Sequence, residues 1–335
     1  MDDNFTVKGI ALVYAGSQYS YAIPNGINSL EGTRSDGEVM AVILQNAGYE
    51  VYLRLDDGLS TFTPRSDPIP ASHKGPATKV QILADFEMAR TKLTSGDNFV
   101  FYFAGHGGRV IDYTSTSTPP SGYDPTLANE NLYSNPYDEY LMLYGLRLNQ
   151  DMTHWIDNTL SDNELASYLN ALPTVNPRLV IIDACNSGGF LGLSKEGRLT
   201  PRAAVDSPAP SEADPWASFF NYNPLSADIV PSNALILTAA GERELSYERT
   251  IDLIDANPLP SSIVESKHGV FTYYLIRGIT QSSADLNSDG FITLGEAWSY
   301  TRQSLINEHN IKFTSSAFLP QISGGSLDFI LVNSL

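Results

Sequence analysis

The stretch LVIIDACNSGGF (179–190) contains the single cysteine of this 335-residue chain. A run of apolar residues leads to Asp183 and Cys185 and then breaks into a turn with Ser187, Gly188 and Gly189. A short apolar run bounded by turn residues is typical of a strand that is buried on both faces of a parallel sheet. The stretch therefore predicts a buried strand that delivers a thiol into a glycine-rich turn.

Similar strand signals recur on both sides of this stretch. Strands are predicted at 9–15, 49–55, 98–105, 178–184, 234–240 and 326–332. Helices are predicted between them, and a Ser or Thr followed three residues later by Glu or Gln marks three of their starts, at Ser35/Glu38, Thr78/Gln81 and Ser161/Glu164. Two more helices are predicted near the end of the chain, at 269–281 and 294–308.

Strands that alternate with amphipathic helices predict a mostly parallel six-stranded sheet with helices on both faces, which is a three-layer α/β sandwich. No linker divides the chain, so residues 1–335 are expected to form one domain. Segments rich in Pro, Ser and Asn at 115–140 and 191–233 are expected to be long loops.

The composition excludes several classes of partner. A formal net charge of −18 argues against binding to nucleic acids or anionic membranes and favours basic substrates. One cysteine excludes an internal disulfide framework. The acidic start MDDNFTVKGI (1–10) does not resemble a secretory signal, so we expect a cytoplasmic protein, with an extracytoplasmic location left open if a signal peptide was removed.

Two of the predicted strands end in chemically reactive turns. The strand at 98–105 runs into His106 and Gly107, and the strand at 178–184 runs into Cys185. If these strands are parallel neighbours, thiol and imidazole leave the sheet at the same edge. The imidazole can then take the proton of the thiol, and the N–H groups of Gly107 and Cys185 can stabilise an oxyanion. Taken singly, each residue has a plainer interpretation, as a small core cysteine and a capped loop histidine.

The order of these motifs resembles a known family. FVFYFAGHGG (99–108) and LVIIDACNSGGF (179–190) resemble the histidine and cysteine motifs of the caspase–hemoglobinase fold, the group of caspases, metacaspases and legumains. The bacterial metacaspase-like (orthocaspase) branch looks most similar. The resemblance extends over LEGTRSDGEVMAVILQNAGYEV (30–51) and SDNELASYLNAL (161–172), and ILTAAGERELSYE (236–248) has legumain-like features. His106 and Cys185 are 79 positions apart, more than the ~50 of caspases, and the polar insertion at 115–140 accounts for the excess.

The resemblance implies a monomeric cysteine endopeptidase with Cys185 as nucleophile, His106 as general base and acid, and Gly107 in the oxyanion hole. It also implies a specificity pocket that contains Asp183 and Asp36, with Ser246 and Tyr247 as its walls. Two carboxylates in one pocket repel each other unless a cation lies between them, which a substrate Arg or Lys would supply.

Alternatives to this pocket stay open at this point. Asp36 also fits the first turn of a helix, and Asp183 fits a strand end that accepts hydrogen bonds from loop amides. Leu30 stands where Asp-cleaving caspases have an arginine, which argues against a preference for Asp, although Arg34 is near. A legumain-like Asn-specific peptidase or transpeptidase, and a catalytically idle calcium-dependent interaction module, are the alternative functions. Lys195, Arg198 and Arg202 in the loop at 191–233 would be sites of self-cleavage for an enzyme that cuts after basic residues.

A calcium site is predicted near the end of the chain. DLNSDGFITLGE (285–296) has the ligand spacing of an EF-hand loop. The expected ligands are oxygen atoms of Asp285, Asn287, Asp289, Phe291, Thr293 and Glu296. Thr293 and Glu296 also fit a capping box, so a simple turn followed by a helix is the competing interpretation.

Overall fold

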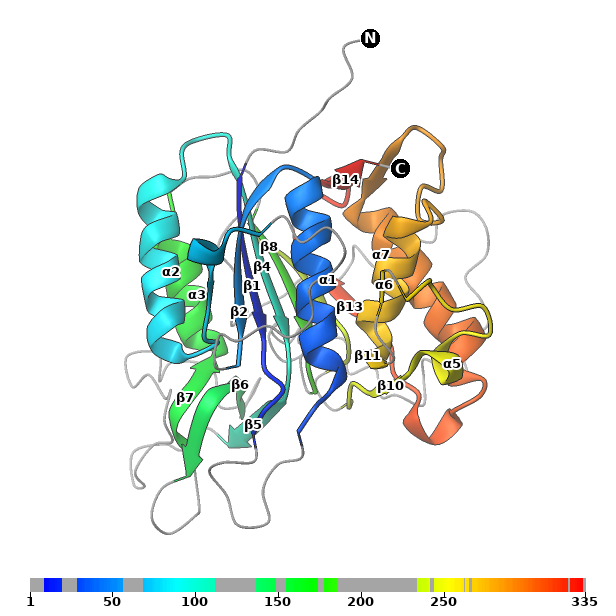
Figure 1. The fold of residues 1–335 in the computed structure, drawn as a ribbon, viewed down its shortest axis with the longest axis horizontal. Coiled ribbons are helices and arrows are strands. Elements are labelled where there is room, and N and C mark those ends of the chain that lie inside the picture. The colour runs from blue at the N-terminus through cyan, green and yellow to red at the C-terminus, as the bar shows by residue number, and fades with distance from the viewer. Residues whose placement is uncertain are drawn as a thin grey trace.

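A seven-stranded sheet forms the centre of the protein (Figure 1). The computed structural model describes residues 9–19, 29–56, 69–111, 137–148, 155–173, 178–185, 234–241, 244–261, 263–264, 267–324 and 326–333. The strands follow the order β13 (Gln321–Ser323), β9 (Ala234–Thr238), β8 (Arg178–Asp183), β4 (Asn98–Ala104), β1 (Gly9–Ala15), β2 (Tyr49–Leu55) and β3 (Lys74–Gly75). Neighbouring strands are parallel except at the β13–β9 edge, which is antiparallel.

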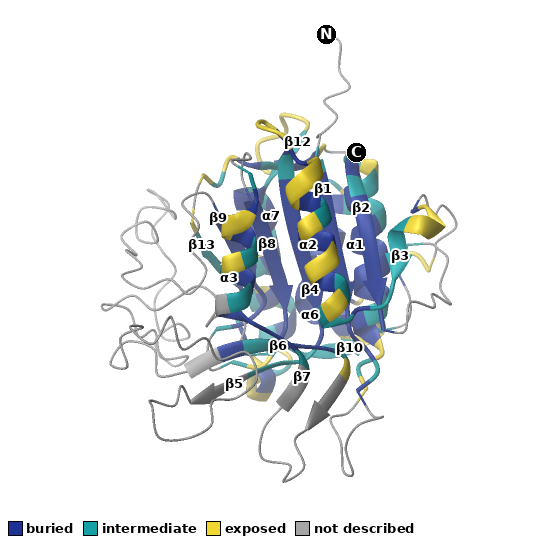
Figure 2. Ribbon diagram, turned by 90° about the vertical axis from the view of Figure 1, so that its left-hand side faces the viewer, coloured by how far each residue is buried: buried dark blue, intermediate teal, exposed yellow. Residues whose placement is uncertain are grey.

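Helices cover both faces of this sheet, as predicted. In Figure 1, α2 (Lys79–Lys92) and α3 (Asp162–Ala171) lie on one face, and α1 (Gly32–Asn46), α6 (Val270–Thr280) and α7 (Leu294–Ser304) lie on the other. The sheet between them is buried, while α2 has one exposed face (Figure 2). Alternation along β4 explains the burial, because Phe99, Phe101 and Phe103 enter the core below α2 and α3 while the residues between them enter the opposite core.

Shorter elements surround the main sheet. A three-stranded antiparallel sheet, β5 (Gly107–Ile111), β6 (Tyr137–Leu148) and β7 (Trp155–Ser161), lies beyond its carboxyl edge (Figure 1). The remaining elements are β10 (Glu248–Thr250), β11 (Lys267–Gly269), β12 (Phe291–Thr293), β14 (Ile330–Asn333), α5 (Ile251–Ile254), a π-helical turn at Leu305–Asn310, and 3₁₀ turns at Ala71–His73 and Thr314–Ser316. No helix in the described ranges is both long and apolar enough to cross a membrane.

Two predictions about strands were wrong. The segment 326–332 does not join the main sheet: β14 pairs with β12, and the carbonyls of Leu327 and Phe329 accept hydrogen bonds from the first amides of α7. The edge position belongs instead to β13. The loop predicted at 115–140 includes the start of β6 from Tyr137, while residues 112–136 and the predicted loop at 191–233 lie outside the described residues.

The start of α1 also differs from the prediction. The helix begins at Gly32, three residues before Ser35. The distant carboxylate of Glu248 accepts hydrogen bonds from the amides of Gly32 (2.8 Å) and Glu31 (3.4 Å), so the helix needs no cap from Ser35. The capping residues Thr78, Ser161 and Thr293 are confirmed by hydrogen bonds to the expected amides.

Candidate active site

The carboxyl ends of β4 and β8 bring the predicted thiol and imidazole to one edge of the sheet. The two strands are parallel neighbours, and Ala104 lies opposite Asp183. The amide of Gly105 donates to the carbonyl of Asp183 (3.1 Å), which extends the pairing by one residue. His106 and Cys185 each follow this matched pair by two positions. The strand register therefore places both residues at the same level of the same rim.

Gly107 shows how close the two turns are. A Cβ atom at Gly107 would run into the carbonyl oxygen of Cys185 and come within 3.0 Å of the Ala184 side chain. Only a glycine fits between the histidine turn and the cysteine turn here. Its amide group therefore lies beside the cysteine backbone.

Cys185 is partly exposed at this edge of the sheet. Its Sγ donates a weak hydrogen bond to the carbonyl of Ser246 at 3.6 Å. Burial raises the pKa of the Cys185 thiol, and the carboxylate of Asp183 raises it further. Because the thiolate is the nucleophilic form, this site needs a base that removes the proton.

Tyr19 fixes the position of His106, although no local sequence pattern indicates this role. The Tyr19 ring packs against the imidazole with centroids 4.7 Å apart, and its hydroxyl accepts a hydrogen bond from the His106 amide at 3.1 Å. On the other side, the amide of Met142 donates to the His106 carbonyl at 2.9 Å. Both backbone groups of the histidine are therefore held by segments that are distant in the sequence.

Asp183 lies buried behind the cysteine, with 5 % of its surface exposed. The hydroxyl of Ser246 donates to its Oδ1 at 2.5 Å, and Thr272 donates to its Oδ2 from the hydroxyl (2.8 Å) and the amide (3.3 Å). Burial, followed by repulsion from Asp36, raises the pKa of Asp183 to about 7. Within the described residues, the contacts of this carboxylate are hydroxyl and amide donors, with no ion pair to a Lys, Arg or His.

Asp36 reaches the same place from the second turn of α1, not from the first turn that the plainer interpretation required. It is completely buried, and its Oδ1 lies 2.7 Å from Nδ1 of His268. Its Oδ2 accepts the amide of Gly269 at 2.9 Å. Burial raises the pKa of Asp36, although the His268 contact and the Gly269 amide act to lower it.

Of the other two predicted pocket residues, one contacts the cysteine and Asp183, and the other contacts residues away from them. Ser246 bridges the cysteine and Asp183 through its carbonyl and hydroxyl groups. The ring of Tyr247 instead contacts Phe318 at a centroid distance of 5.8 Å and the guanidinium of Arg249. Arg34 approaches Glu38 at 3.8 Å within its own helix.

The loop at 285–296 is folded around its own polar side chains. Asp285 accepts the amides of Asp289 and Gly290, and Oε1 of Glu296 accepts the amides of Leu286 and Asn287. Glu296 also forms the capping box with Thr293 at the start of α7. No group of three or more His, Cys, Asp or Glu side chains placed to hold a metal ion is found among the described residues.

A thiol and an imidazole on one rim of a parallel α/β sandwich, in front of a buried carboxylate, define a cysteine hydrolase. The chain belongs to the family described as Caspase domain, whose model matches residues 8–324. It is therefore a cysteine peptidase, and the predicted fold class and family resemblance are confirmed.

The fold has a relative of known structure. The crystal structure of protein GSU0716 from Geobacter sulfurreducens is similar, with a TM-score of 0.53 and 17 % sequence identity over 95 % of this chain and 94 % of that chain. At this identity the likeness shows a shared fold. No curated protein matches this sequence.

Replacing Tyr19 with phenylalanine should lower kcat about fivefold and leave KM unchanged. The ring remains against the imidazole, but the His106 amide loses its acceptor, which costs about 1 kcal/mol of positioning. Peptidase kinetics measure the split between kcat and KM. Tyr52→Phe is the matched control, because its hydroxyl bonds to Glu50 far from the rim. Equal kinetics for Tyr19→Phe and wild type would contradict this role.

Proposed function

We propose that this peptidase hydrolyses peptide bonds on the carboxyl side of arginine and lysine. The surroundings of the Asp183 carboxylate support the proposal. Its carboxylate is buried next to the cysteine and has hydroxyl and amide partners but no cation among the described residues. A buried carboxylate without a counter-ion is unfavourable, and a substrate guanidinium or ammonium would provide that counter-ion.

The proposed mechanism assigns one step to each group. His106 takes the proton from Cys185, and the thiolate attacks the carbonyl carbon of the basic residue. The amides of Gly107 and Cys185 would stabilise the oxyanion, and the imidazolium would then protonate the leaving amine. Water hydrolyses the resulting thioester and regenerates the thiol.

Replacing Asp183 with asparagine tests the specificity. At pH 8 we expect kcat/KM for peptides with Arg before the scissile bond to fall about a hundredfold or more, because the charged pair is lost from a desolvated pocket. Peptides with Asn, Asp or citrulline at that position measure the change in preference. Asp252→Asn, an exposed carboxylate on α5, is the control. An undiminished preference for Arg in Asp183→Asn would overturn the proposal, and a preference for Asn peptides in wild type would favour the legumain-like alternative.

The acidic net charge of −18 supports attraction of basic peptides and proteins as substrates. The same specificity would allow cleavage of the chain itself after Lys195, Arg198 or Arg202, which lie outside the described residues. We also propose a monomeric enzyme.

We also propose that the loop at 285–296 binds calcium. The contact of Glu296 with the amides of Leu286 and Asn287 brings the twelfth position of the loop over its first positions, as a bidentate ligand requires. Oxygen atoms of Asp285, Asn287 and Asp289 would complete the ligand set together with the Phe291 carbonyl and Thr293. Calcium there would brace the connection between α6 and α7.

Calcium should therefore raise the melting temperature of the wild-type chain relative to a chelator. A ligand at a hundred times its Kd stabilises the folded state by about 2.7 kcal/mol. Glu296→Gln should abolish the response, because glutamine retains the capping box but cannot supply a bidentate carboxylate. Identical melting curves for wild type in millimolar calcium and in chelator would sink the calcium proposal and leave the capping box as the role of Glu296.

A further inference from the structure

A completely buried imidazole lies beside the two carboxylates of the rim, and the peptidase mechanism does not use it. His268 in β11 has Nδ1 at 2.7 Å from Oδ1 of Asp36 and Nε2 at 3.2 Å from the hydroxyl of Ser35. These three residues have the connectivity of a nucleophilic triad. However, each is 0 % exposed, so no substrate carbonyl can reach Ser35. The imidazole must act on its neighbours instead.

Two carboxylates converge beside His268. A Cβ atom at Gly269 would lie 2.5 Å from Oδ2 of Asp183 and 2.8 Å from Oδ2 of Asp36. A side chain at position 269 would therefore separate or displace the carboxylates, and glycine lets them converge. Two ionised carboxylates this close in a buried site need a compensating positive charge.

One of these two carboxylates contacts an imidazole, whereas the other has no cationic partner among the described residues. Asp36 touches the imidazole of His268, whereas Asp183 receives hydrogen bonds from Ser246 and Thr272. Asp183 is also the carboxylate on the cysteine strand, two residues before the nucleophile. The unpaired charge is therefore the one that a bound substrate would meet.

We propose that His268 is a specificity-determining residue, which as an imidazolium neutralises Asp36 so that Asp183 presents a single negative charge to one cationic substrate side chain. The proposal rests on cleavage after basic residues. It assigns Asp36 a role as partner of His268 and not as a second contact for the substrate. The acidic pocket then matches one arginine or lysine in charge.

The ionisation of Asp183 provides the readout. Around the pair, the titratable and charged groups among the described residues are Asp36 from α1, His268 from β11, Tyr102 from β4, Tyr273 from α6, Cys185 beyond β8, and Glu248 from β10, which pairs with Lys267. Because the pKa of Asp183 is raised to about 7, its carboxylate is ionised above that pH and becomes neutral as the pH falls through it. Discrimination between an arginine peptide and its neutral citrulline analogue should therefore disappear on acidification.

The experiment measures the ratio of kcat/KM for these two peptides as a function of pH. The ratio cancels the ionisation of Cys185 and His106, which affects both peptides equally. In His268→Asn, the midpoint of the ratio should rise by about one pH unit, because Asp36 then repels Asp183 without compensation. In Asp36→Asn, the midpoint should fall by about one unit, because an uncompensated imidazolium then favours ionised Asp183. The double variant lacks both the Asp36 carboxylate and the His268 imidazolium, so these two positions again have no net charge. Its midpoint should therefore return close to the wild-type value.

Each outcome decides between the proposals. An unchanged midpoint in a folded His268→Asn, or equal midpoints in Asp36→Asn and the double variant, would show that the imidazole carries no charge and would overturn the inference. Circular dichroism identifies a variant that does not fold, and Asp36→Asn and the double variant then carry the test. A wild-type ratio near one at every pH would instead overturn the proposed preference for basic residues. Failure of the inference and failure of the proposed function are therefore distinguishable.

Discussion

Changing Cys185 to alanine should abolish peptide hydrolysis by this chain, and changing His106 to alanine should leave a residual rate about a thousandfold below wild type. The first variant removes the only thiol in the sequence, so no other cysteine can take over the attack. The second keeps the thiol but removes the base, whose contribution is typically about 10²- to 10⁴-fold. Rates with an arginine peptide at saturating substrate measure both effects.

Alkylation of the thiol separates loss of the base from loss of the fold. Burial and Asp183 raise the pKa of Cys185, so the wild-type thiol needs His106 to react near neutral pH. In His106→Ala, alkylation by iodoacetamide should slow and shift to higher pH, while the mass still increases by a single label because there is one cysteine. His73→Ala is the control, since His73 stacks on Tyr52 at the other side of the sheet.

The same Cys185→Ala variant tests self-processing. If wild type cuts itself after Lys195, Arg198 or Arg202, mass spectrometry should find the intact chain accumulating in the variant alone. Residual hydrolysis in purified Cys185→Ala would refute the assignment of the nucleophile. Identical fragments in both proteins would refute self-cleavage while leaving the nucleophile in place.

The sequence predicts the rim well because its determinants are local. The apolar runs before His106 and Cys185 require buried strands, and parallel strands end on the same edge. The observed register, with Ala104 opposite Asp183, then follows from two strands that end in equivalent turns. The Gly107 contact with the cysteine backbone results from the same equivalence.

The residues that the sequence could not predict act across long chain separations. His268 reaches Asp36 over 232 positions, and Tyr19 reaches His106 over 87. Neither contact carries a periodic or spacing signal. The packing of α1 against β11 brings Asp36 to His268, and the pairing of β1 with β4 brings the segments that carry Tyr19 and His106 together. Likewise, Glu248 caps α1 from 216 positions away, so the local Ser35 signal predicted the wrong start. Edge strands such as β13 are three residues long and have too little pattern to detect.

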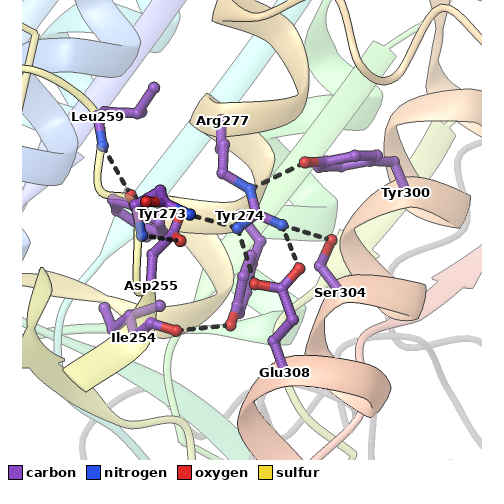
Figure 3. Close-up of polar contacts among 10 residues, drawn as sticks. Ile254, Asp255, Leu259, Tyr273, Tyr274, Arg277, Tyr300, Ser304 and Glu308 are labelled. Carbon is purple, nitrogen blue, oxygen red and sulfur yellow. Dashed lines mark hydrogen bonds and ion pairs between the residues drawn. The ribbon is translucent and has the colours of Figure 1, made fainter. Parts of the chain in front are cut away.

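A buried ion cluster is centred on Arg277 (Figure 3). Arg277 of α6 donates to two carboxylates, with Nη1 at 2.8 Å from Asp255 and Nη2 at 2.5 Å from Glu308. Its remaining donors bond to the hydroxyls of Tyr300 (2.8 Å) and Ser304 (3.1 Å). The guanidinium also lies over the ring of Tyr274. One side chain thus joins α6, α7, the π-helical turn and the segment after α5.

Arg277→Met should lower the free energy of unfolding by about 3–5 kcal/mol. Methionine retains much of the apolar stem, but Asp255 and Glu308 are left as buried or half-buried charges without a counter-ion. Urea unfolding followed by circular dichroism measures the difference. Arg90→Met is the matched control: Arg90 makes a similarly short contact of 2.6 Å with Glu87, but this pair is exposed and should contribute nothing measurable.

The difference in unfolding free energy between wild type and Arg277→Met should depend on pH, and this dependence identifies the part of the difference that is electrostatic. Burial alone would raise the pKa of Asp255, but the hydrogen bond and charge of Arg277 lower it below its usual value. A carboxylate with a lowered pKa stabilises the folded state above its unfolded pKa of about 4, and this stabilisation is lost as the pH falls through the folded value. The gap between wild type and Arg277→Met should therefore be full at pH 7 and narrow below about pH 4. A gap that is independent of pH would mean that Arg277 stabilises the helices through packing on Tyr274 and not through its charge.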